Sequence, residues 1–511
     1  MIEIGAATLQ LEDFNAILYK GEKIELNNTA FQKVEKSFQF LKTFSEDKLI
    51  YGINTGLGPM AQFRINEEDT KQLQYNLIRS HAAGAGNKMP HLYVKATMLA
   101  RLNTLMQAHS GISPEVVTTL TKMINKDICP VIYEHGGVGA SGDLVQLAHL
   151  ALGLIGEGNV TVGGVERETA EVFKEYGIKP IEIHIREGLA LINGTSVMTG
   201  IGMINVIQTK RLLEWSVFAS TIINEIMESY DDHFSEELNG VKHHKGQKLV
   251  AGMMREIAST SKLIRKRADF LYKKINDNVL KEKVQEYYSI RCIPQILGPI
   301  LDVIESTQEV LVNEVNSAND NPIIDAEREN VYHGGNFHGD YVSFEMDKLK
   351  IAITKLSMLA ERQINFLMNN KLNDKLPPFV NLGTLGLNLG MQGVQFTATS
   401  TTAENKTLSY PMYINSIPNN NDNQDIVSMG TNSALLAKKI IENAYEVLSI
   451  EVMTLCQAID YLNVQDKLSD QAQKVYHAIR EVFPVFTEDT PRYIDIIAVN
   501  NYISKNNFNL I

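Results

Sequence analysis

Several features are scarce in this chain of 511 residues, which has three cysteines, one tryptophan and 14 prolines. The cysteines, Cys129, Cys292 and Cys456, lie far apart and have no paired spacing. This excludes a disulfide framework and a zinc knuckle, and it favours a reducing cytoplasm. The adjacent His243 and His244 have no third metal ligand nearby, so they predict a basic turn in solvent rather than a metal site.

The chain also lacks the marks of a membrane, secreted or nucleic-acid-binding protein. No apolar run is long enough to cross a bilayer, and the N-terminus, MIEIGAATLQLEDF, has early acidic residues instead of a signal-peptide pattern. Acidic residues outnumber basic ones by 60 to 48, for a formal charge of −12, which disfavours nucleic acid and anionic membranes as partners. With 44% hydrophobic and 21% charged residues, the composition is typical of a soluble, cytoplasmic globular protein.

Long helical patterns are abundant in the later part of the sequence. Four stretches are rich in Leu, Ile and Met and nearly free of proline: 198–235, 295–317, 341–370 and 431–463. Each is longer than the mean helix of about 11–12 residues. The earlier residues are broken by glycines and predict short helices, loops and one hairpin around VTVGGVE. We therefore expect a mainly α protein with a loop-rich domain at 1–197 and a long-helix bundle with terminal helices at 198–511.

The segment HGGVGASGDL, residues 135–144, surrounds Ser141 with four glycines and an alanine and precedes an apolar run typical of a buried helix. Asp143 suits the start of that helix because acids favour the positive end of the macrodipole. One interpretation is a glycine-rich turn before a core helix; a phosphate loop is excluded, because the Gly-Lys-Ser/Thr pattern is absent. The other interpretation is chemical. The nitrogen of Gly142 can attack the carbonyl carbon of Ala140, and loss of two waters then leaves an electrophilic exocyclic methylene.

The wider stretch GVGASGDLVQLAHLAL resembles the signature of the aromatic amino acid ammonia-lyases, the family of histidine, phenylalanine and tyrosine ammonia-lyases. Further blocks are similar to that family, in family order over residues 1–465: YGINTGLGPMAQ at 51–62, NLIRSHAAGAG at 76–86, LALINGTSVMTG at 189–200, VQEYYSIRCIPQILG at 284–298, SANDNPII at 317–324, GGNFHGD at 334–340 and NNNDNQDIVSMG at 419–430.

The resemblance implies a prosthetic group and an assembly. Family members build 4-methylideneimidazol-5-one (MIO) from such a tripeptide, so Ala140, Ser141 and Gly142 are expected to form it, with no metal, nucleotide or external cofactor. The implied fold is that of the fumarase/aspartase-like superfamily, with a loop-rich MIO-bearing domain on a long central helical bundle. The implied partners are an aromatic amino acid and, in a homotetramer with shared active sites, other copies of the chain.

The resemblance also implies roles for single residues. Tyr51 matches the base that removes the substrate β-proton, a task for which a phenol, with an ordinary pKa of about 10, needs a positive pocket. Arg291 matches the bidentate anchor of the substrate carboxylate, and Asn193 matches a donor near the MIO ring and the amino group. The other residues expected in the site are Gly58, Gln285, Tyr288, Asn423 and Phe337, the last from another subunit.

Two positions bear on the substrate and point in different directions. Ser80 and His81 occupy the ring-recognition position and resemble histidine ammonia-lyases, although a histidine nitrogen also suits a phenol hydroxyl. Gln424 stands where histidine-specific members have a glutamate, and it resembles the phenylalanine and tyrosine enzymes. We expect deamination of L-tyrosine to trans-4-coumarate and ammonia. The alternatives are histidine or phenylalanine ammonia-lyase, an aromatic aminomutase and a non-catalytic helical scaffold.

Overall fold

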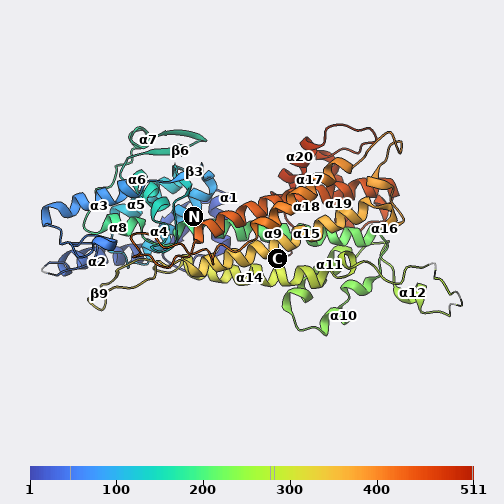
Figure 1. Cartoon of the computed structure of the whole chain (residues 1–511), viewed down its shortest axis with the longest axis horizontal. Helices are drawn as coiled ribbons and strands as arrows, with labels where there is room; N and C mark the ends of the chain where they lie inside the picture. The colour runs from blue at the N-terminus through green and yellow to red at the C-terminus, as the bar shows by residue number, and fades with distance from the viewer. Residues whose placement is uncertain (47, 275, 277, 281, 509, 511) are drawn as a thin grey trace. The chain divides into compact units, whose positions relative to one another are not determined.

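The computed structural model describes residues 1–46, 48–274, 276, 278–280, 282–508 and 510. Helices dominate it (Figure 1), which confirms the expected mainly α fold. The chain forms two compact units. The first unit consists of Met1–Ile207, Thr307–Asp347 and Pro411–Lys438, and the second of Gln208–Ser306, Lys348–Tyr410 and Lys439–Ile511. These units are assembled from alternating segments, so the division into 1–197 and 198–511 stays a prediction about domains.

The elements divide between the units as follows. In the first unit lie β1 (Ile2–Ile4), α1 (Leu11–Tyr19), β2 (Ile24–Leu26), α2 (Asn28–Phe44), η1 (Gly58–Met60), α3 (Glu67–His81), β3 (Ala85–Lys88), α4 (His91–Met106), α5 (Pro114–Asn125), β4 (Cys129–Pro130), β5 (Tyr133–His135), α6 (Leu144–Leu154), β6 (Asn159–Val162), β7 (Val165–Glu168), α7 (Thr169–Tyr176), α8 (Glu187–Ile192), β8 (Ile323–Asp325) and β9 (Asn330–Tyr332). In the second lie η2 (Asp231–Phe234), α10 (Glu236–Gly240), α11 (Lys245–Ala258), α12 (Arg267–Leu271), α13 (Tyr288–Arg291), α16 (Asn370–Asn373), η3 (Pro378–Val380), α17 (Gln392–Leu408), η4 (Gln465–Lys467), α19 (Asp470–Val482) and α20 (Tyr493–Ile503). Residues of both units belong to α9 (Ser196–Ile226), α14 (Ile293–Val315), α15 (Asp340–Met368) and α18 (Gly430–Leu462).

These four long helices confirm the stretches predicted from apolar spacing. The first one, α9, ends at Ile226 rather than at 235. Glu228 adopts a left-handed backbone with φ of 54°, which a helix cannot continue through. Tyr230 and Phe234 beyond it are nevertheless buried, so the apolar pattern runs on after the helix has stopped.

The strands form small sheets in the first unit. β1 pairs with β2 in parallel, while β3 with β5, and β8 with β9, pair antiparallel. β4, β6 and β7 form a three-stranded antiparallel sheet. Within it β6 and β7 make the predicted hairpin, closed by Gly163 and Gly164 and with Val162 opposite Val165.

Each unit has its own apolar core. In the first, α3, α6 and α8 pack against one another (Figure 1), and α6 is buried on nearly every face, as its composition predicts. In the second, apolar side chains such as Ile223 on α9 and Ile364 on α15 are fully buried, and the buried side chains of Ser220 and Gln363 on these helices are hydrogen-bonded at 3.0–3.1 Å. Within the described part of the chain, no helix combines the length and apolarity needed to span a bilayer.

Candidate active site

The segment with Ser141 is held against Gly194 by a short parallel bridge in the first unit. The Gly194 amide donates to the Ser141 carbonyl at 3.3 Å, and the Asp143 amide donates to the Gly194 carbonyl at 2.8 Å. Gly142 lies between these bonds with φ of 73°, and a Cβ there would lie 1.9 Å from the Gly194 oxygen. Only glycine fits this position. The Gly142 nitrogen, the atom that would attack Ala140, takes no part in the two hydrogen bonds of this bridge.

Asp143 has a different role from the one that its place before α6 suggests. Its side chain makes no capping bond with α6. The buried carboxylate instead accepts hydrogen bonds from the amides of Val197 and Met198, at 2.8 and 3.0 Å, and from the Thr431 hydroxyl. It therefore caps α9 and connects this helix with the start of α18. Burial raises the pKa of Asp143 to about 6, against the lowering effect of these hydrogen bonds.

Two polar side chains predicted for the site converge on Ser141. The Asn193 amide Nδ2 donates to the Ser141 carbonyl at 3.2 Å, and the Gln424 amide Nε2 donates to Ser141 Oγ at 3.0 Å. Asn193 Oδ1 is buried and has no hydrogen-bond partner among the described residues, so it is an acceptor available to a donor that enters the site. Asn423 is exposed, and its backbone amide closes a turn onto the Asn420 carbonyl at 3.1 Å.

Tyr51 and Gly58 are brought together by the loop between them. The Gly58 amide donates to the Tyr51 hydroxyl oxygen at 3.0 Å. Gly58 has φ of 52°, and a Cβ there would lie 2.9 Å from Asn420 Nδ2, so this loop lies against the segment that carries Gln424. The Gln74 side chain of α3 fixes the loop by donating to the Gly52 carbonyl at 3.1 Å.

The end of α3 carries the ring-recognition pair Ser80 and His81. His81 Nδ1 lies 2.9 Å from the Leu77 carbonyl oxygen. The Leu77 carbonyl can only accept a hydrogen bond, whereas Ser80 Oγ, 3.1 Å from the same Nδ1, can donate or accept one. In the tautomer whose Nδ1–H donates to Leu77, Nε2 is left as a hydrogen-bond acceptor.

The segment around Phe337 also reaches the Ser141 loop within the same chain. His338 Nδ1 lies 3.4 Å from the Ala140 carbonyl oxygen, and the Gly339 amide donates to the Gly139 carbonyl at 3.1 Å. The Ser428 hydroxyl donates to the same Gly139 carbonyl at 2.9 Å. These supporting roles of His338 and Ser428 were not predicted from the sequence, although the two residues stand inside the blocks GGNFHGD and NNNDNQDIVSMG. A contribution of Phe337 to a second subunit stays a prediction.

Three predicted site residues, Gln285, Tyr288 and Arg291, belong to the second unit. The side chains of Gln285 and Tyr288 are exposed, with Tyr288 at 70%. The Arg291 guanidinium lies over the Tyr288 ring, 4.7 Å from its centroid, and its Nε is buried without a hydrogen-bond partner in the described structure. Their roles beside Ser141 stay predictions.

Known proteins resemble this chain over nearly its whole length. A family model described as aromatic amino acid lyase matches residues 9–481. The chain belongs to the aromatic amino acid lyase family. Tyrosine 2,3-aminomutase of Myxococcus sp. (strain Mx-B0) is 38% identical over 487 residues, covering 94% of this chain and 92% of that protein. Histidine ammonia-lyase of Staphylococcus saprophyticus is 38% identical over 505 residues, 98% of each chain.

The solved structures confirm the fold of this aromatic amino acid lyase. Tyrosine aminomutase from Streptomyces globisporus superposes with a TM-score of 0.94 at 35% identity, covering 99% of this chain and 97% of that one. Members of the aromatic amino acid lyase family use MIO, and residues 140–142 of this chain fit its formation. Ala140 is small and buried, Gly142 has no room for a Cβ, and polar groups reach Ser141 from Asn193 and Gln424.

Proposed function

We propose that this aromatic amino acid lyase deaminates L-tyrosine to trans-4-coumarate and ammonia, with MIO formed from Ala140, Ser141 and Gly142. The observation that carries the proposal is the convergence of Asn193 and Gln424 on Ser141, beside a Gly142 that tolerates no side chain. The ring supplies an electrophilic methylene to the substrate. The remaining work belongs to ordinary side chains, which bind and orient the substrate and move protons.

Tyr51 is the base in this proposal. Its hydroxyl oxygen accepts a hydrogen bond from the Gly58 amide at 3.0 Å, which fixes the position of the atom that would receive the proton. As phenolate, Tyr51 takes the proton from the β-carbon while ammonia leaves the α-carbon. Asn193 Oδ1, buried and unpartnered in the described structure, is suited to hold the departing amino group through an N–H.

The acceptor at His81 supports a phenol as the substrate ring. With the proton on Nδ1, directed at the Leu77 carbonyl, Nε2 can accept a hydrogen bond from the tyrosine hydroxyl. A site built for such a bond rejects the analogue without the hydroxyl, so phenylalanine should be a much poorer substrate. The role of Arg291, binding the substrate carboxylate, rests on the family resemblance alone. The same holds for Gln285, Tyr288, Phe337 and Asn423, which complete the proposed site.

Side-by-side assays test the substrate. Purified enzyme is incubated with L-tyrosine, L-phenylalanine and L-histidine, and 4-coumarate, cinnamate and urocanate are followed by absorbance. We expect 4-coumarate and ammonia in equal amounts, with tyrosine as the best substrate. Urocanate from histidine without 4-coumarate from tyrosine would assign the chain to the histidine enzymes instead.

Substitution of the base tests the mechanism. Tyr51→Phe should lower kcat by about 10²–10⁴-fold, the usual contribution of a positioned acid or base. Tyr176→Phe, on α7 in the same unit, is the matched control and should keep full activity because Tyr176 lies outside the site residues. Equal kcat values for Tyr51→Phe and wild-type enzyme would remove Tyr51 from the reaction.

A second outcome on the same substrate is a 2,3-aminomutase, and the names of two relatives, from Myxococcus and Streptomyces, favour it. In that reaction the amino group returns to the β-carbon instead of leaving. Chromatography of the tyrosine incubation for β-tyrosine distinguishes the two: a lyase accumulates 4-coumarate and free ammonia, whereas a mutase accumulates β-tyrosine.

A homotetramer in the cytoplasm completes the proposal. Leu385, Leu387 and Leu389 are each more than half exposed, and such neighbouring exposed leucines are typical of a surface that a partner covers. Light scattering of the purified protein should give four times the chain mass, and a monomer mass would contradict shared active sites. The three cysteines are free, as expected in a reducing compartment.

A further inference from the structure

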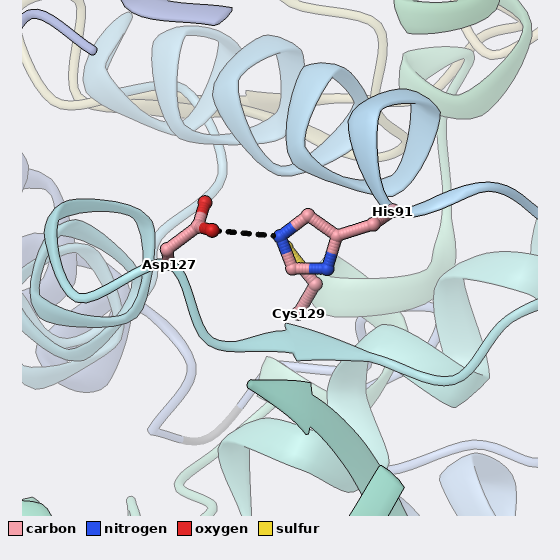
Figure 2. Close-up of side chains that lie close together, drawn as sticks. All are labelled: His91, Asp127 and Cys129. Carbon is pink, nitrogen blue, oxygen red and sulfur yellow. Dashed lines mark hydrogen bonds and ion pairs between the residues drawn. The ribbon is translucent and has the colours of Figure 1, made fainter. Parts of the chain in front are cut away.

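Three metal-ligating side chains meet on the first unit, among residues that the active site does not use. His91, Asp127 and Cys129 point their ligand atoms toward one another (Figure 2), and these atoms all lie within 4.8 Å of one another. His91 Nε2 is 3.1 Å from Asp127 Oδ2 and 3.5 Å from Cys129 Sγ. His91 starts α4, Asp127 lies in the turn after α5, and Cys129 starts β4.

Two of the three separations match those between ligands of one tetrahedral ion. Zn²⁺ binds imidazole nitrogen and carboxylate oxygen at about 2.0–2.2 Å and thiolate at about 2.3 Å. Tetrahedral geometry then places a nitrogen and an oxygen about 3.3 Å apart, and a nitrogen and a sulfur about 3.6 Å apart. Both short separations in the cluster agree with these values within a few tenths of an ångström.

The backbone and a fourth side chain hold the carboxylate in this position. Asp127 has a left-handed φ of 57°, which turns the chain between α5 and β4 and brings Cys129 back beside His91. Lys95, one helical turn after His91, donates to Asp127 Oδ1 at 2.6 Å. Asp127 Oδ2 therefore faces His91 while Oδ1 stays with the ammonium, the arrangement in which a ligating carboxylate keeps a supporting hydrogen bond.

We propose that His91, Asp127 and Cys129 form a binding site for Zn²⁺, with water as the fourth ligand. The mixed nitrogen, oxygen and sulfur set suits this borderline-soft cation better than Mg²⁺ or Ca²⁺, which bind oxygen ligands. One side of the cluster is closed by the buried Cys129, and the side chains of His91 and Asp127 are 31% and 51% exposed. This leaves an entry path and room for the water. A bound ion would depart from the expectation of a chain without metal, which arose because His91 lies too far from Asp127 and Cys129 in the sequence to form a motif with them.

Hydrogen bonds to the ligand side chains set the strength of binding. A zinc-bound histidine usually donates its other ring N–H to an acceptor, whereas His91 Nδ1 is buried without a partner among the described residues. Loss of such support weakens binding by about 10–100-fold. We therefore expect an affinity below that of structural zinc sites, so that the metal leaves on treatment with a chelator.

Cobalt substitution tests the site directly. The full-length protein is stripped with a chelator and titrated with Co²⁺, which gives a thiolate-to-cobalt charge-transfer band only when a cysteine sulfur binds it. We expect one Co²⁺ per chain, this band, the strong visible absorption of a tetrahedral site, and displacement by Zn²⁺. Cys129→Ser should abolish the band, and His91→Asn should weaken binding at least about 10-fold. Cys292→Ser and the double variant His243→Asn/His244→Asn are the matched controls and should bind Co²⁺ as wild-type does.

Two results would overturn the proposal. One is the absence of a charge-transfer band from wild-type protein, which would leave the cluster as an ion pair beside a buried thiol. The other is a band that survives Cys129→Ser or disappears in a control variant, which would place the metal elsewhere. His91 and Asp127 are partly exposed, so His91→Asn and Asp127→Asn test the site in folded protein even if Cys129→Ser fails to fold.

Discussion

Two glycine-rich segments of the first unit look alike in sequence and differ in what their glycines do. Gly163 and Gly164 close the β6–β7 hairpin with φ of 56° and 79°, and a Cβ at either would meet nothing within 4 Å. Gly142 has φ of 73°, but its Cβ would lie 1.9 Å from the Gly194 oxygen. The hairpin needs glycine for its backbone angles alone, whereas the Ser141 loop needs it also for close approach to another chain segment.

The surroundings of the two segments differ in the same way. The hairpin carboxylates are exposed, and Glu166 pairs with Lys88 in solvent. The Ser141 loop has a buried carboxylate, Asp143, and receives hydrogen bonds from Asn193 and Gln424. The proposed chemical role is therefore assigned to the segment whose surroundings constrain it, since positive φ angles do not distinguish the two.

The largest expected effect comes from adding one methyl group to each segment. Gly142→Ala must push back the Gly194 carbonyl, which breaks the bridge that holds Ser141, so MIO formation and deamination should both be lost. In Gly164→Ala the added methyl group contacts no other atom. The free energy of unfolding should therefore fall only by the cost of a left-handed backbone at alanine, about 1–2 kcal/mol. Intact mass, ammonia release and urea unfolding of both variants provide the measurement. Active Gly142→Ala enzyme would show that the close approach is dispensable.

A smaller effect is expected at the polar contact with Ser141 Oγ. Gln424→Glu introduces a carboxylate at the position that, by family resemblance, corresponds to the glutamate of histidine-specific members. The ratio of kcat/KM for histidine to that for tyrosine should rise at least about 10-fold, or about 1.4 kcal/mol. The intact mass should still show the loss of two waters. An unchanged ratio would remove Gln424 from substrate selection.

The last expected effect is the pH dependence of stability, and its sign should differ between the two segments. Burial raises the pKa of Asp143 to about 6 from an ordinary 3.8. The native state then holds this proton more tightly, so the stability from Asp143 is complete below about pH 4 and is lost as the pH rises through 6. Over this pH range, the free energy of unfolding of wild-type protein, measured in urea, should fall by at most about 3 kcal/mol relative to that of Asp143→Asn.

The hairpin provides the control for that series. The hydrogen bonds of Glu166 with Lys88 and Asn159 lower its pKa. Relative to Glu166→Gln, wild-type protein should therefore gain stability as the pH rises, by an amount that solvent screening keeps small. The same sign for both carboxylates would contradict the assignment of Asp143 as a buried acid.

The sequence predicted features that depend on local patterns. The long helices α14, α15 and α18 begin close to their expected starts because their apolar spacing is uninterrupted, and Gly163–Gly164 marked a hairpin turn. The predicted end of α9 at residue 235 was wrong, because buried Tyr230 and Phe234 continue the apolar pattern past Glu228, whose backbone is left-handed. An apolar pattern reports burial, and burial persists where the helix does not.

Contacts between distant segments could not be predicted in this way. The family blocks predicted Asn193 and Gln424 as site residues, but their hydrogen bonds to Ser141 depend on how three remote segments cross. The place of Asp143 before α6 suggested a role in that helix, whereas its carboxylate caps α9. His91 stands too far from Asp127 and Cys129 in the sequence for any spacing rule to group them.

The intact mass of the purified full-length protein tests the central claim most directly. Cyclisation at Ala140, Ser141 and Gly142 predicts a mass lower by two water molecules than the sequence requires. For Ser141→Ala it predicts the full mass calculated from the sequence and no deamination. An active wild-type protein of unreduced mass, or a Ser141→Ala variant that still releases ammonia, would contradict the account.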